Sequence, residues 1–324
     1  MSRCEGSLIQ AKQRLRDGLA ASQVQLLPLV LVLHLRMYTM ELLIVSITDV
    51  LEKLTSADPN VDYHSRSELS SSEVATYLRD PLEWWHIYKA DANWKKEVTP
   101  AMEFGTAVHL CAERGGWDGL AMEIPVEVLN DDGHCKGKAW TAWKATNEAL
   151  VYFKPGERNP LAEIWHNLQA NAFCRIALDA ARVEGGLEKV HVWEDEYLGP
   201  CRMKADCITG PLLIDWKTTN KTDTRSFAND AAGMGYDVRL CLYRRGYRNL
   251  FGANPEIYVV AIRSSGSYRV TPYRIPDTWL DDAEARLVML VDEMNHFDLA
   301  SFLDAKPIEL PQPRFAKLDL EDFT

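Results

Sequence analysis

From residue 60 onward, apolar and polar positions alternate with a helical period at both ends and with the period of strands between them. The first helix is predicted to begin at Ser70 or Ser72, either of which suits an N-cap, and to end at Asp80-Pro81. The other predicted helices cover 81–88, a segment containing 104–109, most of 139–182, 235–250 and 276–300. Strands are predicted at about 189–197, 201–208, 212–218, 256–263 and 267–274. This order predicts an α/β (α+β) fold.

The segment 206–217 departs most clearly from an ordinary strand pattern. Its second strand is apolar on both faces, which is typical of a buried central strand: Leu212, Leu213, Ile214 and Trp216. Yet Asp215 and Lys217 lie in the same strand, two positions apart and therefore on one face. An even-length loop around 209–211 would bring Asp206 to that face, whereas an odd-length loop would turn it away. A surface hairpin with a solvated salt bridge is the alternative.

These three charges suggest a chemistry. Cross-strand neighbours place two carboxylates and an ammonium within roughly 5–8 Å of one another. Carboxylates at that spacing suit a hard divalent cation, and the ammonium can steady a developing negative charge. Burying an unpaired charge costs free energy, so charged residues in a buried strand indicate that they bind a partner or a metal.

Composition constrains the function only loosely. The chain of 324 residues, 47% hydrophobic, can bury the core of one large domain or two small ones. Its net charge of −11 argues against a polyanionic partner unless a local basic groove or a bound metal compensates. The seven cysteines show no C-x-x-C spacing, so we expect reduced thiols in a cytosolic protein and no disulfide framework or zinc site.

The two ends of the chain are expected to lie outside the core. The apolar segment 26–35 is interrupted by His34 and followed by Arg36, so it falls short of the ~20 residues of a membrane span. We expect residues 1–59 to form a peripheral helix or a poorly ordered extension. Residues 306–324 are expected to form a loop-like tail.

Several motifs follow one another in a recognisable order. They are Leu69-Ser70-Ser71-Ser72, Gly105-Thr106-Ala107-Val108-His109, Asp206, Asp215-Trp216-Lys217-Thr218-Thr219, and a helix with Tyr236, Arg239 and Tyr243. This order over roughly 60–260 resembles the RecE-like (exonuclease VIII type) branch of the PD-(D/E)XK nuclease superfamily. The resemblance implies a restriction-endonuclease-like core, with a central mixed β-sheet flanked by helices and an N-terminal helical region. The nuclease domain would span 60–305, with a helical part at 60–185, a catalytic sheet core at 186–275 and a C-terminal helix at 276–300.

The resemblance also implies a role for each matched residue. Metal would be bound by two aspartates, the carbonyl of the residue after the second, a histidine and an upstream glutamate: Asp206, Asp215, Trp216, His109 and Glu188. For that glutamate, Glu194 and Glu196 are alternatives on the strand nearest the hairpin. Lys217 would orient the attacking water and offset charge in the transition state. His109 has the alternative of a hydrogen-bonded core histidine.

A second group of residues is expected to contact DNA. It comprises Ser72, Arg202, Lys204, Tyr236, Arg239 and Tyr243. For Arg202 and Lys204 the alternative is a solvated strand edge. Arg239 stands where the family usually has glutamine. A cation there can bind the DNA backbone more strongly than an amide, or it can neutralise a catalytic carboxylate and weaken metal binding.

The resemblance thus implies a Mg²⁺-dependent deoxyribonuclease, with Mn²⁺ as a substitute, that resects double-stranded DNA ends in phage recombination. Relatives often form rings and work beside a single-strand annealing protein, so a homo-oligomeric ring and an annealing partner are expected. The expected location is the cytoplasm of a bacterial host, with no membrane association. No iron–sulfur cluster is expected, because Asp80 precedes Pro81 and no cysteine follows Cys241. The alternatives are a nuclease-fold DNA-binding or assembly protein without turnover and a structure-specific endonuclease.

Overall fold

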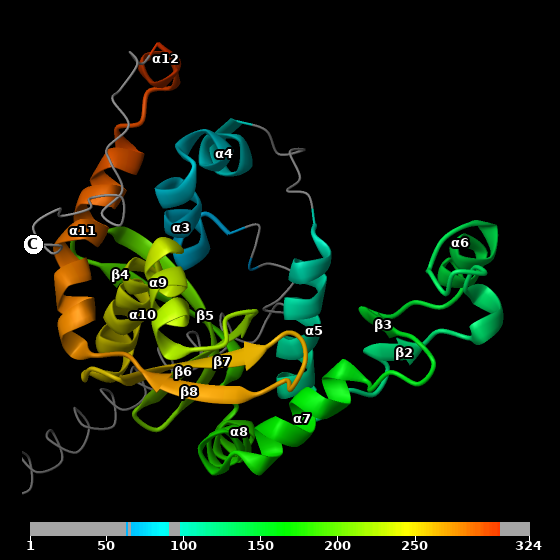
Figure 1. The fold of residues 1–324 in the computed structure, drawn as a ribbon. Helices are drawn as coiled ribbons and strands as arrows, with labels where there is room; N and C mark the ends of the chain where they lie inside the picture. Colours follow the sequence, from blue (N-terminus) through cyan, green and yellow to red (C-terminus); the bar gives the residue numbers. More distant parts are fainter. Residues whose placement is uncertain (1–62, 64–65, 91–97, 305–324) are drawn as a thin grey trace, which may run out of the picture. The chain divides into compact units, whose positions relative to one another are not determined.

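The computed structural model describes residues 63, 66–90 and 98–304 (Figure 1). Contacts divide the chain into two units, Met1–Arg66 and Ser67–Thr324, and the second contains the sheet and its helices. The predicted extension 1–59 and tail 306–324 lie outside the described residues. Within the described part, none of the helices has the length and apolar character needed to cross a membrane.

The core of the second unit is a six-stranded mixed sheet. Its strands are β1 (Leu69–Ser70), β4 (Leu187–Asp195), β5 (Gly199–Thr209), β6 (Leu212–Thr219), β7 (Glu256–Arg263) and β8 (Val270–Arg274). The order is β1-β5-β6-β7-β8, and β4 pairs with β5. The β1–β5 and β6–β7 pairs are parallel, whereas β4–β5, β5–β6 and β7–β8 are antiparallel.

Helices cover both faces of this sheet (Figure 1). One apolar cluster packs the sheet against α3 (Ser71–Arg79), α9 (Thr224–Gly233), α10 (Tyr236–Phe251) and α11 (Asp277–Asn295). The other packs it against α5 (Pro100–Arg114), α7 (Pro160–Ala170) and α8 (Ala172–Glu184). Strand β6 contributes Leu213 to the first cluster and Trp216 to the second, so it is buried on both faces, as its composition predicts.

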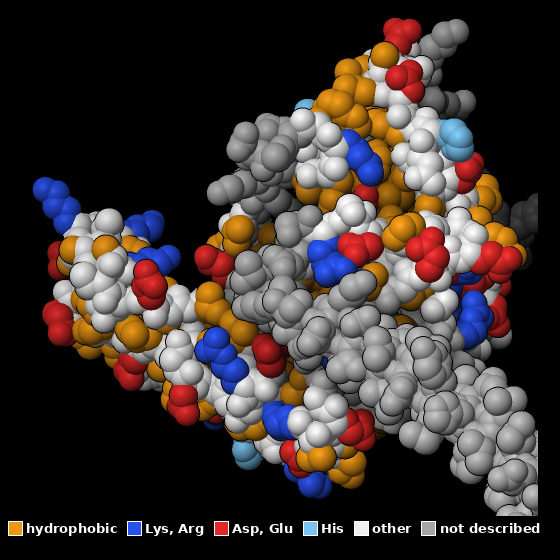
Figure 2. All heavy atoms as spheres, turned by 180° about the vertical axis from the view of Figure 1, so that it is seen from behind, with side chains coloured by type: hydrophobic (Ala, Val, Ile, Leu, Met, Phe, Trp, Pro, Cys, Tyr) orange, Lys and Arg blue, Asp and Glu red, His pale blue; other side chains and the backbone are white. Residues whose placement is uncertain are grey.

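Two predicted helical segments differ in detail. The segment predicted at 81–88 forms α4 (Pro81–Trp85) and continues as a π-helix over His86–Ala90. The segment 139–182 is interrupted by β3 (Val151–Phe153), which pairs in parallel with β2 (Ala121–Glu123). Together with α6 (Lys138–Lys144), these strands form an arm beyond α5 and α7 (Figures 1 and 2). On the face drawn in Figure 2, acidic and basic side chains are interspersed over the described surface.

Local signals explain where the first helices begin and end. Ser70, and not Ser72, caps α3, because its side-chain oxygen accepts a hydrogen bond from the amide of Glu73 at 3.2 Å. Asp80 follows α3 and caps α4 through the amides of Leu82 and Glu83. One short side chain therefore separates two helices, as the Asp80-Pro81 pair predicts.

The β5–β6 hairpin closes through the two residues Gly210 and Pro211, because Thr209 pairs with Leu212. Gly210 has a φ of 48°, and a positive φ at the first loop position is typical of a type II′ hairpin turn. The loop is even in length, so the strands have the register that brings the two aspartates to one another.

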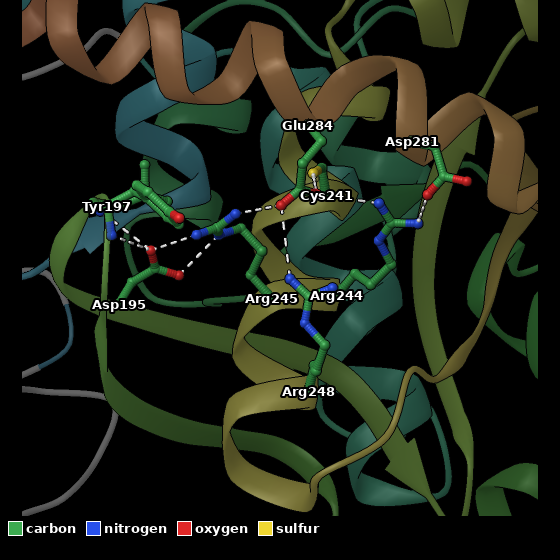
Figure 3. Close-up of polar contacts among 9 residues, drawn as sticks. Asp195, Tyr197, Cys241, Arg244, Arg245, Arg248, Asp281 and Glu284 are labelled. Carbon is green, nitrogen blue, oxygen red and sulfur yellow. Dashed lines mark hydrogen bonds and ion pairs between the residues drawn. The ribbon is translucent and has the colours of Figure 1, made fainter.

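A polar network fastens α10 to α11 and to the β4–β5 turn (Figure 3). Arg245 donates two hydrogen bonds to Asp195, at 2.8 and 2.6 Å, and another to Glu284. Arg244 donates to Asp281 at 2.7 Å and to Glu284 at 3.1 Å. Both arginines are buried, so these contacts replace the water that their guanidinium groups lose on folding.

We predict that Gly186→Ala destabilises the fold by about 2–3 kcal/mol, since overpacking against backbone requires the backbone to move. A Cβ at Gly186, between α8 and β4, would lie 1.9 Å from the carbonyl oxygen of Ile208 in β5. The amide of Ile208 also donates to the Gly186 carbonyl at 2.8 Å, so the residue before β4 is held close to β5. Urea unfolding measures the change. The matched control is Gly233→Ala, whose added Cβ meets nothing within 4 Å and is expected to leave stability unchanged or slightly higher. Equal stability of the two variants would contradict the prediction.

Candidate metal centre and active site

The site forms along one edge of β5, at the point where this edge stops pairing with β1 and begins to pair with β6. This edge pairs with β1 at residues 201 and 202, and with β6 at residues 207 to 209. Between them, residues 203–206 pair with no described strand on that side, so their backbone needs other partners. The Tyr243 hydroxyl of α10 donates to the carbonyl of Lys204 at 3.1 Å. The gap leaves room for side chains at a fork between strands.

Asp206 lies at this fork. It is the neighbour of Cys207, whose pairing with Ile214 ends the β5–β6 ladder, and Asp215 is the neighbour of Ile214 on β6. The Trp216 amide donates to Asp206 Oδ2 at 2.6 Å, which fixes the carboxylate against β6. Asp206 is 7% exposed and Asp215 4% exposed. The hairpin thus brings the two carboxylates together, as the even-length loop predicts.

On one side of Asp206 lie His109 and Glu188. His109 Nδ1 is 3.4 Å from Asp206 Oδ1 and 3.3 Å from Glu188 Oε1. The ligand atoms of these three residues lie within 4.8 Å of one another, close enough to hold one metal ion. His109 reaches the site from α5. Gly105 lies one turn earlier on this helix, and a Cβ added there would lie 3.6 Å from Thr218 Oγ1 of β6. Helix α5 therefore lies close to β6 one turn before His109.

Glu188 has an unusual backbone for its place in β4. Leu187 pairs with Cys207 and Lys189 with Ala205, which puts Glu188 across from Asp206. Its φ is +50°, a left-handed conformation that costs energy for a residue with a side chain and is concentrated at functional sites. Lys204 Nζ lies 2.9 Å from Glu188 Oε2 and holds the carboxylate in place.

Of the three candidate glutamates, the structure brings only Glu188 to Asp206. Glu194 pairs with Pro200 at the other end of β4, about 20 Å along the strand. Glu196 lies beyond β4, towards the turn that leads into β5.

On the other side of Asp206 lies Lys217. Its ammonium is 2.5 Å from Asp215 Oδ2 and 3.9 Å from Asp206 Oδ2. It also donates to the Trp216 carbonyl at 3.1 Å, which is the oxygen predicted as a metal ligand. One ammonium thus contacts three of the predicted metal-binding groups.

The pKa values reflect this close packing of charge. Burial would raise the pKa of Asp206, but His109 and Lys217 hold it at about 2. Burial and the neighbouring Asp206 raise the pKa of Asp215, against the attraction of Lys217. Burial would lower the pKa of His109, but Asp206 and Glu188 raise it to about 10. Without a metal, a protonated His109 therefore offsets part of the negative charge of the carboxylates.

The donor set fits a divalent cation. Carboxylate and carbonyl oxygens are preferred by Mg²⁺ and Mn²⁺, and an imidazole nitrogen is a ligand of many divalent metals. His109 must lose its proton to ligate, so binding of a metal is coupled to release of that proton. The group His109, Glu188 and Asp206 is therefore a candidate metal site.

Helix α10 adds a second cation near Asp215. Burial would lower the pKa of Arg239, but the negative charge of Asp215 raises it. The Arg239 guanidinium lies 5.7 Å from the ring centre of Tyr236, which is itself buried. Tyr243 is also buried and uses its hydroxyl on the β5 backbone. Arg239 and the two tyrosines thus border the site through α10.

Two predicted DNA-contacting residues lie farther away. Arg202 is about 13 Å along β5 from Asp206, is 3% exposed and lies 3.8 Å from Glu68 Oε2. Ser72 is exposed on the first turn of α3, where its carbonyl accepts a hydrogen bond from the Thr76 hydroxyl. The structure does not bring these two residues into the group around Asp206.

Sequence reasoning missed three supporting contacts. They are the Trp216 amide on Asp206, the Tyr243 hydroxyl on the Lys204 carbonyl, and the Lys204–Glu188 ion pair. The ion pair depends on the β4–β5 register, which no local pattern states. The other two depend on the gap in β5 pairing.

A mixed sheet flanked by helices, with an Asp–Asp–x–Lys set at a fork between strands, defines a PD-(D/E)XK-like domain. Residues 86–301 match the family described as "PDDEXK-like domain of unknown function (DUF3799)". The chain belongs to this family, which confirms the superfamily and the fold class predicted from the sequence.

A solved structure from Eubacterium rectale, named "Putative exonuclease", matches with a TM-score of 0.50 at 12% identity. The match covers 83% of this chain and 96% of that chain. At this identity the likeness shows the fold alone. No curated protein matches the chain.

Proposed function

We propose that the protein is a metal-dependent DNA nuclease whose reaction takes place at Asp206. The proposal rests above all on one observation, the meeting at Asp206 of a possible metal group with the Lys217 ammonium. A salt bridge on a surface hairpin, the alternative from sequence, does not account for the burial of both aspartates or for His109 and Glu188 beside them.

Each residue then has a distinct task. A bound divalent cation would supply Lewis acidity at the scissile phosphate. Asp206, Glu188 and His109 would hold it, and Asp215 would complete the set once Lys217 turns from it to the phosphate. Lys217 would orient the attacking water and offset the negative charge that develops on the phosphate oxygens. Lys204 and the Trp216 amide would keep Glu188 and Asp206 in position.

The finer proposal is a Mg²⁺-dependent exonuclease of the RecE-like type, with Mn²⁺ as a substitute, that resects duplex ends in phage recombination. It is supported by the order of the motifs from Leu69 to Tyr243. The same resemblance carries the proposed ring, the annealing partner and the location in a bacterial cytoplasm. A ring would suit the acidic balance of the chain, because basic side chains need line only an inner channel.

The test is digestion of end-labelled duplex DNA by the wild-type protein with Mg²⁺, with Mn²⁺ and with EDTA. We expect loss of label from the ends with either metal and none with EDTA. Covalently closed circular DNA should stay intact, since a strict exonuclease needs an end. Cutting of the circle would make the protein an endonuclease, and no metal-dependent cutting of any DNA would overturn the proposal.

One observation favours a second candidate, a DNA-binding protein of nuclease fold without turnover. The charge of Arg239 acts directly on Asp215, and a permanent cation there competes with a metal ion. Under this alternative, wild-type protein binds duplex DNA but does not cut it at any metal concentration.

We predict that Arg239→Gln lowers the Mg²⁺ concentration for half-maximal cleavage by roughly 3- to 10-fold, the effect of about 1 kcal/mol. The reason is that the substitution removes one unit of positive charge beside Asp215 while it keeps a hydrogen-bonding side chain. Initial rates over a Mg²⁺ titration measure it. Arg248→Gln on the exposed end of α10 serves as the control, with no expected change. A higher Mg²⁺ requirement in Arg239→Gln would contradict the prediction.

A further inference from the structure

The sheet register extends from the candidate metal site to an aromatic residue at the other edge. Asp215 in β6 pairs with Val259 in β7, and Val259 pairs with Tyr273 in β8. Paired residues in neighbouring strands share a face, so these three side chains lie on one side of the sheet. Two strand spacings place Tyr273 about 10 Å from Asp215.

An apolar cavity of ≈ 470 Å³ lies at this end of the row, bordered by α9, α10, β7, β8 and the start of α11. Its walls are mostly aromatic and aliphatic: Phe227, Tyr236, Val259, Tyr273, Ile275 and Trp279. Thr224, Asn229 and Arg274 supply its polar atoms. The volume is in the range of ordinary small-molecule sites, which combine apolar walls with a few polar groups.

Tyr236 connects this cavity to the site around Asp206. It lines the cavity, and its ring also lies 5.7 Å from the guanidinium of Arg239, the cation whose charge acts on Asp215. One aromatic side chain therefore borders both the cavity and the charged group. A ligand with an anionic part near the Arg239 guanidinium and a flat apolar part in the cavity would span the two.

We propose that the cavity holds an unpaired nucleobase of the DNA strand whose phosphodiester lies at Asp206 and Asp215. The proposal rests on the nuclease function above. A DNA strand is a ligand of the required kind, since a phosphate and a neighbouring base are joined within one nucleotide. Aromatic walls bind bases by stacking, which accepts any base because every base has a flat π-face.

The geometry of the walls suits stacking. Phe227 and Tyr273 already lie nearly parallel, with ring centres 5.1 Å apart and an interplanar angle of 18°. Trp279, only half buried, comes from the first turn of α11. Asn229 and Thr224 can donate and accept hydrogen bonds at a base edge. Arg274 is exposed and 3.5 Å from Asp277, so its charge is partly balanced.

A base in this cavity cannot be paired or stacked in a duplex. The strand would therefore enter the site after its terminal base pairs have opened, and duplexes with frayed ends should be cut faster than those closed by G·C pairs. The unpairing costs a few kcal/mol, which stacking on the aromatic walls would offset.

The test combines abasic substrates with pocket variants. Single abasic sites are placed at successive positions near the end of a DNA strand, and KM and kcat are measured with wild type, Trp279→Ala, Trp279→Phe and Tyr197→Ala. In the wild type, one abasic position should raise KM roughly 5- to 150-fold, the range for loss of one base–aromatic stack. In Trp279→Ala the same abasic site should raise KM only slightly further, because the stacking contact that the missing base would make has already been removed.

The controls separate stacking from general damage. Trp279→Phe keeps a flat ring and should retain most of the wild-type abasic effect. Tyr197, 66% exposed next to the β4–β5 turn, is an aromatic residue away from the cavity, and its variant should behave as wild type. Additive effects of the abasic site and Trp279→Ala would overturn the inference and leave the nuclease function standing, whereas wild-type protein that cuts no DNA overturns both.

A second measurement stands if Trp279→Ala does not fold. 2-Aminopurine placed at each of these positions in turn should lose fluorescence at one of them when wild-type protein binds, because stacking quenches it. Unchanged fluorescence at every position would overturn the inference and leave the cavity for a protein segment, such as one from a second copy of the chain.

Discussion

Asp206→Ala is expected to lower the rate of metal-dependent DNA cleavage by about 10³-fold or more. Asp206 is the residue through which the two halves of the site meet, because its Oδ1 faces His109 and its Oδ2 faces Lys217 and the Trp216 amide. Its loss removes a metal-binding carboxylate and also the anchor for both cations. Single-turnover cleavage of end-labelled duplex at saturating Mg²⁺ measures the effect.

The matched control is Asp282→Ala, which removes an exposed carboxylate of α11 and should cleave as wild type. Lys217→Ala should lower the rate by about 10²–10³-fold and leave metal affinity intact or higher, since it removes a transition-state contact but no ligand. Wild-type rates in Asp206→Ala, with folding verified by thermal unfolding, would rule out this site.

Arg245→Ala is expected to destabilise the fold by about 3 kcal/mol or more, because breaking one side of a buried ion pair leaves the partner charge uncompensated. Arg245 makes two hydrogen bonds to Asp195 and one to Glu284, and it joins β4, α10 and α11 (Figure 3). Burial would raise the pKa of Asp195, but the hydrogen bonds and charge of Arg245 lower it. Urea unfolding at neutral pH measures the loss.

The control is Arg248→Ala, half-exposed on the same helix and 3.7 Å from Glu284, with an expected loss of less than about 1 kcal/mol. The pH dependence gives a second readout. Because the folded pKa of Asp195 is below its ordinary 3.8, its contribution is present above that pH and is lost as the pH falls through the folded value. Equal losses in Arg245→Ala and Arg248→Ala would contradict the assigned role.

The sequence predicts the fold well where the signal is local. The buried strand 212–218 follows from a run that is apolar on both faces, and the structure has this strand with its two charges. The loop length does not follow from the sequence, which allows an even or an odd loop, and the structure decides for the two residues 210–211. The short strands β2 and β3 escape prediction because three residues in each carry too little periodicity to be told from the helical pattern around them.

The candidate site is harder to predict because its geometry is made by long-range pairing. Glu188 lies across from Asp206 through the β4–β5 register and through its own left-handed backbone, and neither is encoded near residue 188. The burial of Arg202 likewise depends on β1, which pairs with β5 from more than a hundred residues away in the sequence. From the sequence, Glu188 and Arg202 are both expected at the site. The strand pairing decides that Glu188 lies beside Asp206 and that Arg202 does not.

The central claim is that Asp206 is the middle of a divalent-metal site. Crystals grown with Mn²⁺ and measured for anomalous scattering test it most directly. We predict one anomalous peak bonded to Asp206 and to at least one of Glu188, His109 and Asp215. A peak elsewhere on the molecule, or none at saturating Mn²⁺, would contradict the claim.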